Sequence, residues 1–390
     1  MDNKTIDNNL ISIAWLFLLL LPVGNLFYIA IPILFICLYK SSYKEINSIK
    51  ITSILLIAVI VLSFILNISE IYITEKDIQR DLTLIIILYT FTNLRGSSIL
   101  KPYIWFAIIY VLLSQISFVF SMSSIASFYD SIYNISGYYF NSLSQDLNRI
   151  EADTIGSTMR LGGIFYNCNN CAAYVSLIYG LGMSEYKQFS KIELILFATV
   201  CFISMFYTGS RTSLIVFSVI SFIFLYTKKI NIILPFIIPT VIFSILSYAD
   251  VSEIRMFKIE DGMNDSFGVK MNILEYYLYR CDDVIDLLFG AGSTNILIQN
   301  YDLTFSGTDF DLGDIVISYG FLFYIVYIPF YIVIFRKIKK EYLVITPVIL
   351  WMFSNTIICN YRMSAVWLLT LGILLRKSLD SANNEGDIKE

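Results

Sequence analysis

The residues in this sequence best suited to chemistry are arginines and aspartates that lie beside long apolar runs. Arg211 lies in the segment 208–213, Thr-Gly-Ser-Arg-Thr-Ser, between two runs without charged residues, 194–207 and 214–226. With its flanks, each run is long enough to cross most of a hydrocarbon core of about 30 Å. The pattern predicts a transmembrane hairpin with Arg211 near its tip. A cation beside a bilayer normally has a partner or a task, although an interfacial arginine can also rest among lipid headgroups.

A second arginine precedes another apolar run. The segment from Arg160 to Ala172 reads Arg-Leu-Gly-Gly-Ile-Phe-Tyr-Asn-Cys-Asn-Asn-Cys-Ala. Together, Arg160 and Arg211 suit a diphosphate, because the planar guanidinium binds phosphate oxygens in pairs and stays charged at any working pH. Asn167 and Asn169 fit either of two roles, capping the following helix or offering amide groups to sugar hydroxyls. Pairing of the arginines with loop carboxylates or lipid phosphate is the alternative.

Three aspartates, Asp309, Asp311 and Asp314, crowd the end of a long polar segment, just before the apolar run 315–335. Acids at a membrane edge are costly unless they are paired or used. The chain contains no histidine, which removes the usual general base, so one of these aspartates would be the base if the reaction needs one. A solvated acidic loop end is the alternative.

The composition places these residues on a membrane protein. Of the 390 residues 57% are hydrophobic and only 15% charged, and the mean hydropathy is +0.71, which together predict a single all-α polytopic domain over 1–390. The first apolar run is too long for a signal peptide and is expected to be retained. Twelve charge-free runs are candidate spans: 10–23, 26–39, 51–68, 82–94, 102–120, 165–184, 194–207, 212–226, 230–248, 315–335, 342–357 and 363–375.

The positive charges orient these spans. If the N-terminus is cytoplasmic, every short inside loop holds at least two lysines or arginines, as the positive-inside rule requires. Both termini are then cytoplasmic, and two larger loops, 121–164 and 249–312, face outward. Function tends to be placed on long loops of this kind. The outward basic residues break the trend and are therefore the ones to question: Lys76, Arg80, Arg149, Arg160, Arg211, Arg255, Lys258, Lys270, Arg280 and Arg362.

No metal site is expected from the sequence. Cys168 and Cys171 form a CxxC pair, but no second pair and no histidine accompany it, and zinc sites normally need four such ligands. We therefore expect a reaction without a metal or another cofactor.

The combination of motifs resembles the superfamily of O-antigen polymerases and O-antigen ligases. In that pattern an Arg-x-x-Gly-x-Phe-x-Asn segment is followed by a Gly-Ser-Arg hairpin and a Gly-x-Gly loop. Here Gly163, Phe165, Asn167 and Asn169 match the first element, and 209–211 and 290–292 match the other two. The ligases of the superfamily have a histidine eleven residues before a glycine, and counting back from Gly320 reaches Asp309 instead. The Asp311-Leu312-Gly313 segment resembles a recurrent Asp-x-Gly of the polymerases.

The resemblance implies a GT-C-like membrane glycosyltransferase of the inner membrane. It would join oligosaccharide repeat units carried on undecaprenyl diphosphate, at the outer face of the membrane, without nucleic acid and with a chain-length regulator as a possible partner. The implied catalytic residues are Arg160 and Arg211 on the diphosphate and one of Asp309, Asp311 and Asp314 as base. Asn167, Asn169, Arg255 and Arg280 are the implied substrate-binding residues.

Three other interpretations remain open from the sequence. A purely structural membrane protein would explain the spans but not the ordered series of motifs. A polysaccharide flippase or other transporter would explain the helices but would usually place charges near the membrane midplane. An O-antigen ligase would use the same donor with a different acceptor, and the missing histidine counts against it.

Overall fold

The computed structural model describes most of the predicted helical part of the chain. The described residues are 47–67, 75–90, 101–119, 162–163, 165, 168–228, 274–275, 277–278, 284–293, 311–338, 342–352, 363–368, 370–372, 374–375 and 378. Every regular element within them is a helix, which confirms the all-α prediction. The predicted spans 10–23, 26–39 and 230–248 and nearly all of the predicted loop 121–164 lie outside the described residues. A total of about twelve spans therefore stays a prediction.

The helices follow the predicted apolar runs closely, with one exception. Helix α4 begins at Glu75, seven residues before the predicted run 82–94, and its first two turns carry five charged residues, of which Asp77, Arg80 and Asp81 are buried. The helices are α3 (Asn47–Asn67), α4 (Glu75–Thr90), α5 (Lys101–Val119), α8 (Cys168–Ser184), α9 (Lys191–Tyr207), α10 (Arg211–Lys228), α13 (Val284–Phe289), α15 (Asp311–Lys337) and α16 (Tyr342–Met352), with a 3-10 turn, η2 (Tyr186–Gln188).

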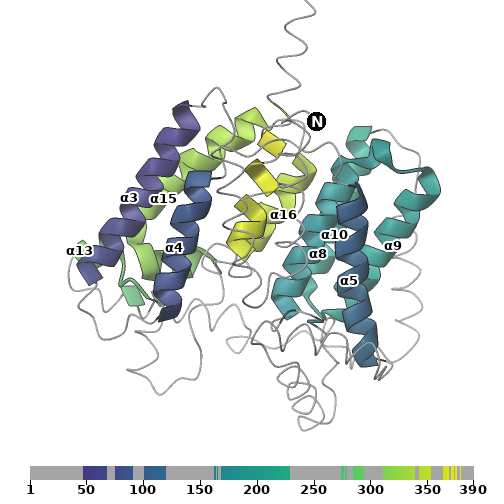
Figure 1. The fold of residues 1–390 in the computed structure, drawn as a ribbon, viewed down its shortest axis with the longest axis horizontal. Coiled ribbons are helices and arrows are strands. Elements are labelled where there is room, and N and C mark those ends of the chain that lie inside the picture. The colour runs from purple at the N-terminus through teal and green to yellow at the C-terminus, as the bar shows by residue number, and fades with distance from the viewer. Residues whose placement is uncertain are drawn as a thin grey trace, which may run out of the picture.

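The described helices form two groups joined by α16 (Figure 1). In one group, α3, α4 and α13 pack around α15. In the other, α5, α9 and α10 pack around α8, which is buried along most of its length. Helix α16 packs against α8 and α10 and also touches α15. The predicted site residues are thus divided between two helix groups that share one connecting helix.

The outer faces of these groups are apolar. On α3, beyond Ser48 and Lys50 of its first turn, the large exposed side chains recur at helical spacing and are hydrophobic: Ile51, Ile54, Leu55, Val61, Leu62, Ile65 and Leu66. A continuous apolar face on one side of a helix needs an apolar environment. Segment Ser48–Asn67 is long and apolar enough to cross a membrane, as is α15 by length and composition.

Helix α15 is broken, although the sequence predicted one continuous span over 315–335. Gly320 has φ 70° and ψ −177°, which is not helical. The Tyr324 hydroxyl donates to the Leu312 carbonyl at 2.7 Å, whereas residues twelve apart in an unbroken helix are about 18 Å apart. The half-helix 311–319 is therefore folded back along the half-helix 321–337. This fold also brings Asp311 within electrostatic range of Tyr327 and Tyr331.

A short segment after α13 crosses α15 at the break. The Ala291 and Gly292 amides donate to the Ile317 and Ser318 carbonyls at 2.7 and 3.1 Å. A Cβ on Gly290 would lie 2.5 Å from the backbone of residues 318–319, and a Cβ on Gly320 would lie 2.3 Å from the Leu288 carbonyl. The two backbones touch, so the crossing requires glycine on both sides.

On the other group, a pair of helix starts is tied together by charge. Ser190 and Glu193 form a capping box at the start of α9, and the Lys101 ammonium at the start of α5 lies 2.9 Å from the Glu193 carboxylate. The sequence predicted Lys101 and Lys191 on the same, cytoplasmic side, and this contact agrees with that pairing of helix ends.

The glycine crossing gives a first prediction. Gly320→Ala should lower the free energy of unfolding by about 2–5 kcal/mol, because it combines a left-handed backbone with a clash against immobile backbone atoms. Gly182→Ala places its Cβ 2.2 Å from the Phe197 ring, a side chain that can be shortened. Thermal unfolding in detergent should therefore show partial recovery in Gly182→Ala with Phe197→Leu. A stable Gly320→Ala protein would contradict the crossing.

The capping box gives a second prediction. The Ser190 amide and the Lys101 ammonium, which both bind the charged form of Glu193, lower the pKa of this carboxyl below its usual 4.5. Its stabilising effect is therefore complete above about pH 4.5 and is lost as the pH falls through the lowered pKa. Melting temperatures between pH 6 and pH 3 should fall more for the wild type than for Glu193→Gln. Parallel curves would contradict the prediction.

Candidate functional site

Four of the nine predicted site residues lie within the described part of the chain. These are Arg211, Asp311, Asp314 and Asn169. The other five lie outside the described residues: Arg160, Asn167, Asp309, Arg255 and Arg280.

Arg211 is the first residue of α10, at the tip of a tight helical hairpin, as the sequence predicted. The turn from α9 is built by Thr208, whose hydroxyl donates to the Met205 carbonyl at 2.6 Å, and by Gly209, whose φ is 63°. The Ser213 hydroxyl donates to the Ser210 carbonyl at 2.6 Å inside the first turn of α10. The Arg211 side chain itself is exposed. An exposed guanidinium beside the amide groups of a helix N-terminus favours the binding of an anion such as phosphate.

The described part of the first motif packs on the C-terminal end of α5. Gly163 has φ 56°, and a Cβ there would lie 2.4 Å from the Ser114 hydroxyl and 3.1 Å from the Gln115 side chain. The Phe165 amide donates to the Gly162 carbonyl at 3.0 Å. The Phe165 ring is buried against Tyr174 of α8, with 5.1 Å between the ring centroids. The matching glycine and phenylalanine therefore hold this turn in place.

Gln115 connects that turn to the arginine hairpin. Its amide nitrogen donates to the Ser204 carbonyl at 3.1 Å, and its amide oxygen accepts from the Ser204 hydroxyl at 2.6 Å. Ser204 lies in the last turn of α9, just before the hairpin that carries Arg211. Thus Gly163, three residues after Arg160, and Ser204, seven residues before Arg211, both lie against the Gln115 side chain. Asn169 lies half-buried in the first turn of α8, beside this turn.

The acidic residues lie in the first turn of the other group's broken helix. Asp311 and Asp314 begin α15, and their exposed fractions are only 0% and 3%. Acids in the first turn of a helix are stabilised by its amide groups and dipole. The alternative of a solvated acidic loop end does not describe Asp311 and Asp314, because the helix begins at Asp311 and both side chains are buried. The described contacts do not place these acids against Arg211.

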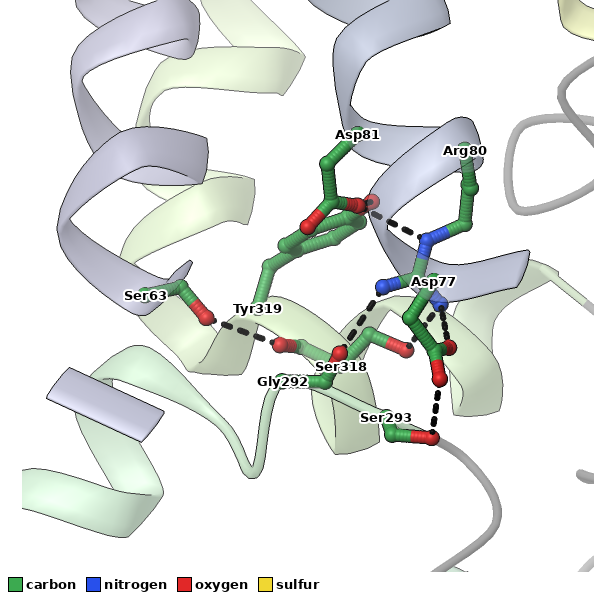
Figure 2. Close-up of polar contacts among 8 residues, drawn as sticks. All are labelled: Ser63, Asp77, Arg80, Asp81, Gly292, Ser293, Ser318 and Tyr319. Atoms are coloured by element: carbon green, nitrogen blue, oxygen red, sulfur yellow. Dashed lines mark hydrogen bonds and ion pairs between the residues drawn. The ribbon is translucent and has the colours of Figure 1, made fainter. Parts of the chain in front are cut away.

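A buried ionic network at the break of α15 was not predicted as a site. Arg80 of α4 binds Asp81 through Nε at 2.9 Å and Asp77 through Nη1 at 3.2 Å (Figure 2). Its Nη2 donates to the Gly292 carbonyl at 2.9 Å and its Nη1 to the Ser318 hydroxyl at 3.3 Å. The exposed fractions of Arg80, Asp77 and Asp81 are 5–6%. A charged group buried this deeply must be paired, and here it is.

The carboxylates of this network bind residues on both crossing segments. Asp77 accepts from the Ser293 hydroxyl at 3.0 Å, and Asp81 accepts from the Tyr319 hydroxyl at 2.6 Å. The Tyr319 ring also lies under the guanidinium, 5.0 Å from its carbon to the ring centroid. Figure 2 shows these side chains converging from α4, α15 and the 290–293 segment on one point.

The C-terminal end of α3 completes the network. The Ser63 hydroxyl donates to the Ser318 carbonyl at 3.0 Å, and the Asn67 amide donates to the Gly290 carbonyl at 3.1 Å. The sequence marked Arg80 as an outward arginine but gave it no partner. The i, i+3 spacing of Asp77 and Arg80 on a helix was the available signal, and it was hidden because the helix was predicted to begin at residue 82.

Comparison with known proteins adds no family assignment: no family model matches the sequence, and no curated protein matches it at a significant level. Within the described residues, no three histidine, cysteine, aspartate or glutamate side chains gather as metal ligands would. The chemistry of the site therefore has to be argued from the geometry of its own residues.

The Gln115 bridge gives a third prediction. Gln115→Leu leaves the buried Ser204 hydroxyl without its acceptor, so it should lower the free energy of unfolding by about 1–3 kcal/mol. Adding Ser204→Ala removes the orphaned group and should restore part of that loss. Thermal unfolding of the two single variants and the double variant measures the coupling. Strictly additive losses would contradict the bridge.

Proposed function

We propose that this protein is a surface-polysaccharide polymerase that joins oligosaccharide repeat units carried on undecaprenyl diphosphate. In this reaction a hydroxyl of the acceptor unit attacks the anomeric carbon of the donor glycan. The glycosidic bond forms, the lipid diphosphate leaves, and the hydroxyl proton passes to a base. The protein would work in the inner membrane with the reacting groups at its outer face and with both termini in the cytoplasm.

The observation that carries the proposal is the meeting of the first two motifs at Gln115. The motif with Arg160 and the hairpin with Arg211 are separated by about forty residues in the chain, yet their described flanks pack on the same end of α5. Arg160 itself lies outside the described residues, and Arg160 and Arg211 at one membrane edge would suit the two phosphates of a lipid diphosphate. Their charge would stabilise the negative charge that develops on the leaving group.

The helix ends support the proposed orientation. Lys101 and Glu193 meet at one end of the second helix group, and the Ser378 hydroxyl donates to the Lys337 carbonyl at 2.9 Å. Each of these pairs joins segments that the charge pattern assigns to the cytoplasmic side. The contacts of Arg80 with Gly292 and Ser318 join segments that it assigns to the outer side.

The aspartates are the proposed base. Asp311 and Asp314 lie on a half-helix folded into the bundle, where a carboxylate is shielded from water. Such shielding favours transfer of the glycan to a sugar hydroxyl over hydrolysis. Asp309 remains the third candidate, on sequence alone. Asn169, with Asn167, Arg255 and Arg280, would bind the sugars.

A second candidate function is transport of the lipid-linked glycan. A helix broken inside the bundle, with an acidic N-terminal turn and a buried ionic network beside it, is a feature of many transporters. Helix α15 has this form. If the protein is a flippase, deletion of its gene would leave no lipid-linked glycan at the periplasmic face. If it is a polymerase, the deletion would leave single repeat units there.

The polymerase proposal predicts the effect of changing Arg211. In a strain lacking this gene, the glycan should stop at one repeat unit, and Arg211→Ala should lower the yield of longer chains by about 100-fold. Arg211→Lys should also leave mainly single units, because lysine keeps the charge but not the paired donors. Glycan ladders on gels, at protein levels matched by immunoblot, measure both.

Arg336→Ala is the matched control, since it also removes an exposed arginine, here from the last turn of α15 and away from the Arg211 hairpin. It should restore a full ladder. Absence of any capped glycan in the deletion strain would favour the flippase or a ligase instead. A full ladder with Arg211→Ala would show that the hairpin only anchors the protein.

A further inference from the structure

We propose that Arg80, together with Asp77 and Asp81, is a positioning residue that fixes the acid-bearing half-helix 311–319 of α15. The geometric part of this inference stands on the contacts of Arg80, and its consequence for the reaction rests on the proposed polymerase function. Arg80 is not offered as a group that touches substrate.

The network grips the last residues of the half-helix. Arg80 donates to the Ser318 hydroxyl, Asp81 accepts from the Tyr319 hydroxyl, and the Tyr319 ring lies under the guanidinium (Figure 2). Gly320 follows directly and has a non-helical backbone. These contacts therefore act beside Gly320, the hinge at which the half-helix could otherwise rotate most freely.

The network also satisfies the end of a helix inside the bundle. A helix leaves its last carbonyl groups without helical partners, and its C-terminus attracts positive charge. Here the Ile317 carbonyl accepts from the Ala291 amide, and the Ser318 carbonyl accepts from the Gly292 amide and the Ser63 hydroxyl. Arg80 supplies the cation at the same end, and it holds the 290–293 segment in place through the Gly292 carbonyl.

Because the half-helix is held at Ser318, the position of its first turn, which carries the acids, is determined as well. Asp314 and Asp311 lie four and seven residues before Ser318, so a helix places them about 6 and 10 Å along the axis from the grip. The half-helix is a short rigid rod, and a small rotation at Ser318 becomes a displacement of the acids. Its charges also match its dipole, with acids in the first turn and a guanidinium at the last.

The occupied donors of Arg80 exclude a role in phosphate binding. Four protein acceptors on three segments bind the guanidinium, and only 6% of the Arg80 side chain is exposed. Arg211, by contrast, is exposed. Loss of Arg80 should therefore change the geometry of the acids and not the affinity for the diphosphate.

The test combines a structural reporter with kinetics on the full-length protein in lipid nanodiscs. Leu312→Cys places a thiol at a half-buried position of the half-helix, and its labelling by N-ethylmaleimide is followed by peptide mass spectrometry. In this background Arg80→Gln should raise the labelling rate about fivefold or more. Arg80→Lys should give a smaller rise, because one ammonium cannot replace the guanidinium fork. Arg336→Gln, the same change at the other end of α15, should give none.

Kinetics with an undecaprenyl-diphosphate-linked repeat unit then test the consequence. Arg80→Gln, without the cysteine, should lower kcat about 100-fold with little change in the donor KM, as misplacement of a reacting group does. Unchanged labelling at position 312 would overturn the inference whatever the activity. Raised labelling with unchanged kcat would overturn it as well.

A wild-type protein that makes no polymer, combined with raised labelling in Arg80→Gln, would overturn the polymerase proposal and would support Arg80 as the residue that fixes the half-helix. If Arg80→Gln does not accumulate, Arg80→Lys and Tyr319→Phe carry the same measurement. Tyr319→Phe removes only the hydrogen bond to Asp81 and should raise labelling less than Arg80→Lys.

Discussion

The break in α15 at Gly320 is the constraint on which the described structure depends. A helix that stops inside an apolar bundle leaves carbonyl groups that water cannot reach, and each must find a donor. The donors come from the 290–293 segment and from Ser63 of α3. This solution requires two backbones in contact, which only glycine at positions 290 and 320 permits. The C-terminal end of α3, the first turns of α4 and the segment after α13 are thereby bound to one point of α15.

The second helix group meets a similar demand with neutral groups. Where the turn at Gly163 reaches α5, the buried polar side chains are Ser114 and Gln115, and Gln115 exchanges two hydrogen bonds with Ser204 of α9 and donates a third to the Cys171 sulfur of α8. A buried amide whose donor and acceptor are both bonded costs little and fixes register. The first group instead uses an arginine between two carboxylates, a combination that is costly to bury but strongly directional. The ionic solution is found at the broken helix, where a helix C-terminus adds to the attraction for a cation.

The sequence was informative where one physical effect dominates. Charge-free runs of 14 to 20 residues predicted α3, α5, α8, α9 and α10 within a few residues, and the Gly-Ser-Arg segment predicted the hairpin tip at Arg211. It failed where two effects compete. The polar first turns of α4 were assigned to a loop because Asp77, Arg80 and Asp81 are not apolar, yet their mutual pairing allows them to be buried. The break at Gly320 was hidden inside an apolar run, since a hydropathy pattern does not report where a helix folds back on itself.

The arginines that the charge pattern assigns to the outer side exceed what the positive-inside rule predicts, and the described residues show two different physical reasons for keeping such a charge. Arg80 is surrounded by acceptors of its own chain, so its charge is consumed in holding α4, α15 and the 290–293 segment together. Arg211 is exposed at the start of a helix, where the field of the backbone amides adds to its own charge. A site that acts on an anionic lipid headgroup needs arginines in both roles. One arginine binds the anionic ligand, and another forms ion pairs within the protein that keep the reacting groups in place. An excess of basic residues on the outer side therefore identifies functional candidates only after burial and pairing have separated the two.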